Sequence, residues 1–232
     1  MQKRTVREAF LRSVPVMAGY IVLGMGFGIL ARNAGYGVLW AFAMSLLMYA
    51  GSMQYVGITL LTGGASVLNT LLTTLMVNAR HLFYSISMID RYRDAGRYRP
   101  YMIFALTDET YSLLCDGKVP EGTDPHRFRF LLSLFNHSYW VLGSVLGSLL
   151  GSVLPFSTEG IEFSMTALFI ASFVEQWRST RQHLPALVGL LGTLASLLIF
   201  GPESFLIPAM LGITLVLTLL QRRLSAGKEA DA

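Results

Sequence analysis

Two clusters of ionisable and polar residues lie within otherwise apolar parts of the sequence. The first contains Asn78, Arg80 and His81, and the second is the adjacent pair Asp108 and Glu109. A guanidinium can hold a carboxylate through two parallel hydrogen bonds, and a histidine exchanges a proton near neutral pH. Carboxyl groups in such surroundings exchange protons at a pH set by burial and by nearby arginines. Together these residue types would suit the binding of a zwitterion coupled to proton movement.

The spacing of the first cluster places two of its polar groups together. Asn78 and His81 are three residues apart, so a helix would carry them on one face. We expect Arg80 to bind a carboxylate, Asn78 to add an orienting hydrogen bond and His81 to carry protons. The alternative is that Arg80 extends its guanidinium to the lipid headgroups and binds no ligand.

The carboxylates of Asp108 and Glu109 would not form a dyad on a helix, because neighbouring residues do not face each other. One of them could face a cavity, and the other could face the lipid boundary or Arg80. We predict that this pair meets an ammonium group or carries the coupling proton. A structural role is equally open, in which Thr107 or Asp108 caps a helix that begins at Glu109.

Two further polar side chains lie deep in apolar stretches. Gln54 costs free energy at bilayer depth unless it has a partner, and we predict that it hydrogen-bonds a ligand. His137 follows Asn136 and is either a second proton carrier or a hydrogen bond between helices. The sequence contains no metal-binding motif, P-loop or dinucleotide fingerprint, so no metal or cofactor is expected.

A membrane-embedded framework must position these residues. Residues 33–79 form a run of 47 residues without a charged side chain, long enough to cross a bilayer twice at about 20 residues for each crossing. Other charge-free runs cover 13–31, 130–158, 182–202 and 204–221. The net charge of +4 comes with basic residues that flank the apolar runs, which is typical of cytoplasmic loops. No nucleic-acid-binding motif accompanies it.

The runs predict an all-α polytopic membrane bundle with about seven membrane segments in one domain, residues 1–232, ending in a polar tail, 222–232. Gly51-Ser52 weakens the second helix, so a broken or re-entrant helix near Gly51–Gly64 is one prediction and a continuous helix is the other. Three simple spans would place the arginine-rich loop 89–100 opposite the basic N-terminus, against the positive-inside rule. A re-entrant segment would remove that conflict.

The sequence contains a weak internal repeat. Residues 20–24, Tyr-Ile-Val-Leu-Gly, match residues 139–143, Tyr-Trp-Val-Leu-Gly, at an offset of 119, and the same offset pairs Gly28 with Gly147. The match suggests two related three-helix units, 10–88 and 130–200. Such repeats are common in secondary transporters, which bind substrate between the units near the middle of the membrane.

Four short motifs resemble the AzlC (BrnF-type) family, the large subunit of branched-chain amino acid exporters. They are Tyr-Ala-Gly-Ser-Met-Gln-Tyr at 49–55, Asn-Ala-Arg-His-Leu-Phe-Tyr at 78–84, Thr-Asp-Glu-Thr-Tyr at 107–111 and Phe-Ser-Met-Thr-Ala-Leu-Phe at 163–169. In the first motif Met53 stands where the family commonly has alanine. The order and spacing of the first three motifs carry the resemblance.

The resemblance implies a multi-pass protein of the bacterial inner membrane that exports branched-chain amino acids, driven by the proton gradient. It also implies a small membrane partner of the AzlD (BrnE) type. We therefore expect a non-enzymatic transporter subunit in which one helical unit rocks against the other around a central site. Two alternatives remain open: an intramembrane hydrolase that uses Ser52 and a histidine, and a passive small-molecule channel.

Overall fold

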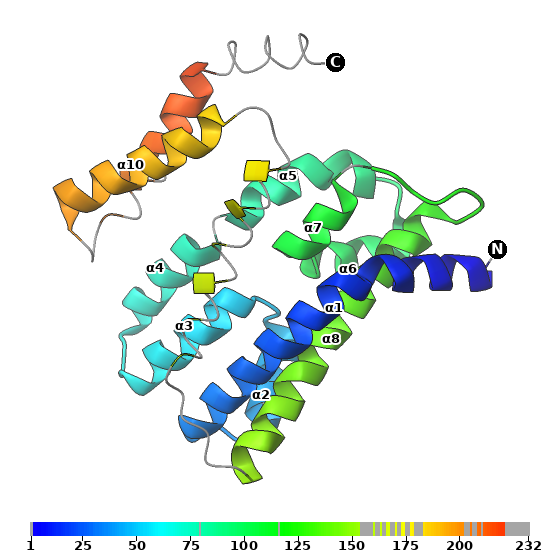
Figure 1. Ribbon diagram of the computed structural model, residues 1–232, viewed down its shortest axis with the longest axis horizontal. Helices are drawn as coiled ribbons and strands as arrows, with labels where there is room; N and C mark the ends of the chain where they lie inside the picture. The colour runs from blue at the N-terminus through cyan, green and yellow to red at the C-terminus, as the bar shows by residue number, and fades with distance from the viewer. Residues whose placement is uncertain are drawn as a thin grey trace. The chain divides into compact units, whose positions relative to one another are not determined.

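The computed structural model describes residues 2–78, 80–115, 117–153, 183–201 and 211–220. It also describes 160, 163, 166–167, 170, 173–174, 177–178, 205 and 208–209. The chain divides into two compact units, residues 1–165 and residues 166–232. All regular secondary structure among the described residues is helical (Figure 1). The predicted all-α class is therefore confirmed, whereas the seven membrane segments stay a prediction.

Unit 1 is organised around two long helices, α1 (Gln2–Asn33) and α8 (Pro125–Val153), which lie side by side in Figure 1. The helices run in the same direction, because Phe10 packs on Phe135 near one end and Gly151 packs on Ile29 near the other. Small residues let membrane helices approach closely. This pair forms the central support of unit 1.

The contact between α1 and α8 is nearly symmetric. A Cβ atom added to Gly24 would lie 2.9 Å from the Trp140 carbonyl oxygen, and one added to Gly143 would lie 2.6 Å from the Ile21 carbonyl oxygen. Ile21 and Trp140 are themselves equivalent at the repeat offset of 119. The next pair repeats the pattern, since Gly28 meets the Ser144 backbone and Gly147 meets the Met25 backbone. Larger side chains at these glycines would separate the helices.

The relationship between two three-helix units, 10–88 and 130–200, stays a prediction, because much of 154–182 lies outside the described residues. The single-domain expectation for residues 1–232 likewise stays a prediction, and the polar tail 222–232 lies outside the described residues.

The predicted break in the second helix is confirmed. Helix α2 (Val38–Leu47) ends, residues 48–50 turn, and α3 (Gly51–Thr62) begins. The two helices fold back on each other, since Ser45 bonds Gln54 and Met44 lies beside Gly57. Tyr49 at the turn has a φ of 43°, a left-handed conformation that is unusual for a bulky residue. Its ring packs against Tyr20, Phe104 and His137.

Helix α3 returns toward the end of unit 1 from which α2 came. The Tyr55 hydroxyl bonds the Leu23 carbonyl, and its ring packs on Phe27, farther along α1 than the contact between Tyr20 and Tyr49. Helices α2 and α3 therefore form a hairpin, and its re-entrance into a membrane stays a prediction. Helix α4 (Val67–Asn78) then leads back, and α5 (Arg80–Tyr92) follows after Ala79.

A second hairpin approaches from the opposite end. A short 3₁₀ turn, η1 (Gly96–Tyr98), leads into α6 (Arg99–Phe104), and α7 (Asp108–Leu114) follows after a break at 105–107. At the break, Thr107 reaches Tyr20 near the middle of α1. Leu114, at the far end of α7, packs near Ala9 and Phe128. The two hairpins therefore bring their tips to the same level of α1.

The basic segments of unit 1 gather at one end. Ala9 belongs to one buried cluster with Met88, Tyr92 and Phe128, and the guanidinium of Arg4 lies beside Gly122. The basic N-terminal segment, loop 89–100 and the start of α8 are therefore neighbours. If the α2–α3 hairpin adds no net crossing, these basic segments lie on one side of the membrane, as the positive-inside rule expects.

Unit 2 contains α10 (Leu184–Phe200) and the helix Leu211–Leu220. Gly192 faces Ile213, and the Ser196 hydroxyl bonds the Phe205 carbonyl at 2.6 Å. α10 lies within the charge-free run 182–202.

Apolar side chains face outward on several helices. Val67 is 87% exposed on α4, Leu39 is 81% exposed on α2 and Leu198 is 78% exposed on α10. Among the described residues, one helix, Lys3–Asn33, is both long and apolar enough to cross a membrane by itself, and four helices of 10–17 residues are apolar but shorter. Half-length helices are expected where two of them share one crossing or form a re-entrant hairpin.

Candidate functional site

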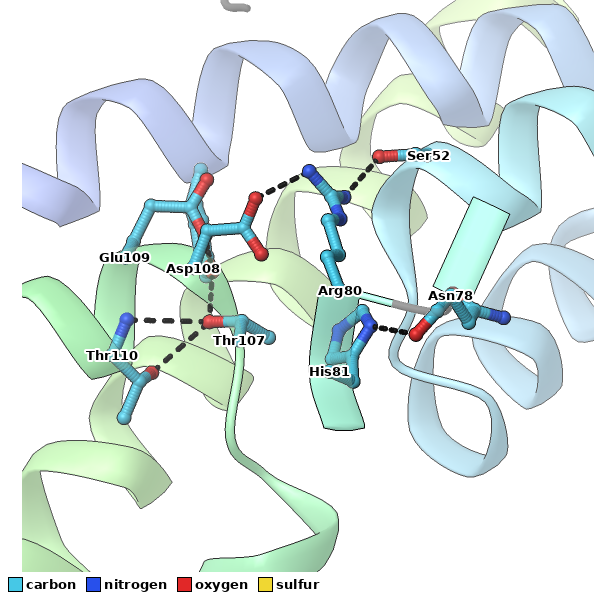
Figure 2. Close-up of polar contacts among 9 residues, drawn as sticks. Ser52, Asn78, Arg80, His81, Thr107, Asp108, Glu109 and Thr110 are labelled. Carbon is cyan, nitrogen blue, oxygen red and sulfur yellow. Dashed lines mark hydrogen bonds and ion pairs between the residues drawn. The ribbon is translucent and has the colours of Figure 1, made fainter. Parts of the chain in front are cut away.

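Arg80 joins the first turns of the two short helices that follow the breaks. Its guanidinium forms an ion pair with Asp108 at the start of α7 and donates to the Ser52 hydroxyl at 2.7 Å, at the start of α3 (Figure 2). The Arg80 and Asp108 side chains are 29% and 33% exposed. The pair is therefore reachable from outside the protein and can exchange partners.

Glu109 points to a different partner from its neighbour, as expected for adjacent residues on a helix. Its carboxylate accepts a hydrogen bond from the Tyr20 hydroxyl at 2.6 Å, and that hydroxyl also lies 2.7 Å from the Thr107 hydroxyl. Tyr20 belongs to α1 and is buried. The side chain of Glu109 is therefore held against the central helix, while Asp108 is held by Arg80.

The start of α7 is fixed by a cap and by α8. Thr107 is the N-cap, and its hydroxyl accepts from the Thr110 backbone nitrogen at 3.3 Å (Figure 2). The Thr110 hydroxyl in turn accepts from the Asn136 amide at 3.0 Å. The structural role foreseen for Thr107 is confirmed, and it coexists with the ion pair of Asp108.

Two buried oxygen atoms at this junction have no hydrogen-bond partner in the described part of the chain. They are Asp108 Oδ1 and the Tyr49 hydroxyl. A buried polar atom without a partner costs about 1–3 kcal/mol. The N-cap of α3, Ala50, provides no side-chain cap either, so the first N–H groups of that helix have no capping side chain. The junction is thus rich in polar groups that a small ligand could bond.

Gln54 lies in a separate, neutral network. Its amide nitrogen donates to Ser45 at 3.0 Å, and its amide oxygen accepts from the Trp140 indole at 2.8 Å. Ser45 donates in turn to Ser144. Gln54 is completely buried, and these bonds tie the first hairpin to α8.

His137 and His81 both bond backbone carbonyls. His137 Nε2 lies 3.1 Å from the Ser45 carbonyl, and Nδ1 lies 2.8 Å from the Tyr101 hydroxyl. A carbonyl only accepts, so neutral His137 carries its proton on Nε2 and accepts from Tyr101. His81 Nδ1 donates to the Asn78 carbonyl at 3.1 Å (Figure 2). The contact joins the residues that the sequence placed on one helix face, although it uses the backbone of Asn78 and not its amide side chain.

The sequence model of the AzlC protein family matches residues 15–154. The chain belongs to the AzlC family. It is 45% identical over 218 residues to the branched-chain amino acid transport protein AzlC of Bacillus subtilis, covering 94% of this chain and 86% of the relative. It is 43% identical to an uncharacterized membrane protein of Haemophilus influenzae over 97% of this chain and 92% of the relative. No solved structure is similar to the chain.

A more distant relative is the inner membrane protein YgaZ of Escherichia coli, 27% identical over 85% of this chain and 83% of its own length. The family match covers the two hairpins, all of α8 and residues 15–33 of α1, and it ends before unit 2. Its relatives are described as membrane proteins, and apolar side chains face outward on several helices. This AzlC-family chain is therefore a membrane protein.

The structure divides the predicted site residues of this AzlC-family protein into two groups. Arg80, Asp108 and Glu109 meet at the junction of the hairpins, with His81 and Asn78 next to Arg80. Gln54 and His137 belong to the neutral network on α8. Their assignment to substrate or protons remains a prediction.

Sequence reasoning missed Tyr20 and Trp140, which hold Glu109 and Gln54. The repeat motif contains both residues, Tyr20 in its first copy and Trp140 in its second, and both copies lie where α1 and α8 meet. A tyrosine hydroxyl or indole N–H in an apolar helix needs a partner. A search for acceptors among the polar residues of the apolar runs could have suggested Glu109 and Gln54 as their partners.

Proposed function

We propose that this protein is the large subunit of a secondary transporter that exports branched-chain amino acids. The name of the Bacillus subtilis relative, at 45% identity over 94% of the chain, supports amino acid transport. The observation that carries the proposal is the ion pair between Arg80 and Asp108 at the meeting point of two broken helices. Charged residues within membrane segments are costly and usually mark a substrate or ion pathway.

The substrate carboxylate competes with Asp108 for Arg80. An arginine fork binds a carboxylate well in two parallel hydrogen bonds, and the exposure of the Arg80–Asp108 pair allows exchange. When Arg80 takes the substrate, Asp108 is released to meet the ammonium group or to accept a proton. The uncapped start of α3 beside Ser52 adds N–H groups that favour a carboxylate.

Glu109 is the second candidate for coupling to protons. Its bond to the Tyr20 hydroxyl links the junction to the central helix. Glu109 accepts that bond as a carboxylate, and a proton on Glu109 changes the hydrogen-bond roles around Tyr20 and Thr107. His81 and His137 remain second-line proton carriers. Asn78 and Gln54 supply hydrogen bonds near the substrate only if their present contacts rearrange.

The membrane arrangement that fits these contacts gives unit 1 three crossings, through α1, α4 with α5, and α8, with two re-entrant hairpins between them. The basic end then faces the cytoplasm, in a multi-pass protein of the bacterial inner membrane. Alternating access would move the hairpins against the tightly packed pair of α1 and α8. A small AzlD-type membrane subunit completes the transporter.

The bonding of Ser52 weighs against a hydrolase. Its hydroxyl accepts from the Arg80 guanidinium, which cannot act as a general base because arginine stays protonated. A serine nucleophile needs a base within hydrogen-bond reach. The protein is therefore not an enzyme in this proposal. Replacement of Ser52 by Ala should reduce transport, and neither the wild type nor the variant should hydrolyse a substrate.

The test is uptake of labelled leucine, isoleucine and valine into inverted membrane vesicles from cells that lack other exporters, with and without the small partner subunit. Under the proposal, a proton gradient drives accumulation above equilibrium, and lysine and glutamate do not compete. If leucine enters at the same rate with and without the proton gradient and only reaches equal concentrations on both sides, a passive channel is the correct function. If no amino acid enters in any combination, the proposal fails.

A further inference from the structure

Two arginines at the basic end of unit 1 lie against each other on different helices. Arg91 is near the end of α5 and Arg129 is near the start of α8, and Arg129 donates to the Arg91 carbonyl oxygen at 3.3 Å. Arg91 donates to the Leu114 carbonyl at 3.1 Å. In the described part of the chain, neither guanidinium forms an ion pair with a carboxylate. Two partly buried positive charges therefore bond neutral atoms.

A buried hydroxyl lies within the field of both charges. Tyr92 is only 3% exposed, and its hydroxyl has no hydrogen-bond partner within the described residues. The positive charges of Arg129 and Arg91 both act on this hydroxyl, and they repel each other. An anion here would bond the free hydroxyl and offset the repulsion between the arginines.

The positions of Arg91, Arg129 and Tyr92 indicate what kind of anion would fit between them. Arg129 immediately precedes the charge-free run 130–158, so its guanidinium lies where hydrocarbon gives way to headgroups. Tyr92 also lines an apolar pocket between α5 and α6, together with Met88, Ile89 and Ile103. Exposed Arg99 lines the same pocket. A soluble anion would use the charges alone, whereas a lipid would use the charges and the pocket.

We propose that Arg91, Arg129 and Tyr92 bind the phosphate of an anionic phospholipid, and that one of its acyl chains lies along the pocket between α5 and α6. Basic pockets between membrane helices on the cytoplasmic side suit such headgroups. The lipid would join α5, which begins at Arg80, to the start of α8. This site is separate from the proposed amino acid site and does not depend on it.

The experiment is native mass spectrometry of the purified full chain, titrated with phosphatidylglycerol and, in parallel, with zwitterionic phosphatidylethanolamine. We expect one phosphatidylglycerol to be retained in preference to phosphatidylethanolamine. The double variant R91Q/R129Q should bind it about tenfold more weakly or worse, because hydrogen bonds to charged groups are lost. The matched control R93Q/R97Q removes two exposed arginines from the same loop and should bind like the wild type.

Three results would overturn the proposal. Equal weakening in R93Q/R97Q would mean that diffuse surface charge attracts the lipid. Displacement of the lipid by millimolar inorganic phosphate would mean that the site holds a soluble anion. If R91Q/R129Q does not fold, Tyr92→Phe decides: it removes one oxygen that has no partner within the protein, so the protein should fold, and an affinity equal to the wild type would exclude the site.

Discussion

The two hairpins of unit 1 meet at their tips but are held by different kinds of bond. The α2–α3 hairpin is fixed to α8 by neutral hydrogen bonds from Gln54 and Ser45 to Trp140 and Ser144, all of which are buried. The α6–α7 hairpin carries two carboxylates, held by Arg80 and Tyr20 from other helices. Both hairpins form neutral hydrogen bonds to α8, which the α6–α7 hairpin makes through Thr110 and Tyr101. The α6–α7 hairpin also carries the two carboxylates, whose partners a ligand or a proton can replace.

This difference indicates which hairpin moves. Buried neutral hydrogen bonds with both partners satisfied add rigidity, whereas a partly exposed ion pair contributes little to stability. We infer that the α6–α7 hairpin and Arg80 respond to substrate, while α2–α3 remains attached to the central helices. The following variants test this division, from the largest expected effect to the smallest.

Replacement of Arg80 by Ala should reduce leucine transport about 30-fold or more. Loss of the charge-assisted hydrogen bonds from Arg80 to the substrate carboxylate costs about 1.5–3 kcal/mol, and Asp108 would lose its cation. The measurement is initial uptake into inverted vesicles at equal protein levels. Arg80→Lys keeps the charge but not the fork, so it should recover part of the rate. If Arg80→Ala transports leucine at the wild-type rate, the ion pair is not part of the substrate site.

Replacement of Glu109 by Gln should reduce accumulation driven by a pH gradient about tenfold, through the loss of one charge-assisted bond, while leucine exchange across the membrane continues. The reason is that exchange needs the substrate site but no net proton movement. Tyr20→Phe removes the partner of Glu109 and should change the pH dependence of accumulation while leaving exchange intact. If Glu109→Gln accumulates leucine normally in a pH gradient, a residue other than Glu109 carries the coupling proton.

Replacement of Gln54 by Leu should lower the free energy of unfolding by about 1–3 kcal/mol, because the buried indole of Trp140 loses its acceptor. The measurement is the midpoint of thermal unfolding in detergent, with uptake by the folded fraction. Asn69→Ala, at an exposed position on α4, is the matched control and should have little effect. If Gln54→Leu unfolds like the wild type but loses substrate affinity, Gln54 is a ligand residue as the sequence predicted.

Replacement of Tyr101 by Phe should have the smallest effect, about 0.5–1.5 kcal/mol in stability, because one hydrogen bond to His137 is lost. The pH profile of transport distinguishes the two roles of His137. An unchanged profile supports a structural link between α8 and Ser45, and a shifted profile supports a proton path through the imidazole.

Sequence reasoning succeeded where the determining interactions are local. The Gly51-Ser52 pair indicated the break before α3, and Thr107 indicated the cap of α7. The bond between Tyr20 and Glu109 joins residues 89 positions apart, and no periodicity reveals such a pair. The break before α7 was also harder to predict from the sequence. The mostly apolar segment 101–115 is consistent with one short helix or with two half-helices.

The repeated glycines of α1 and α8 also constrain how this protein could have arisen and how it alternates. Equivalent residues touch across helices that point the same way, so a duplicated ancestral segment would have inserted twice with the same sidedness. Transporters built from oppositely inserted copies can open to either face by swapping the shapes of their halves. A same-sided pair cannot exchange shapes in this way, and its two open states would arise as one unit rocks against the other.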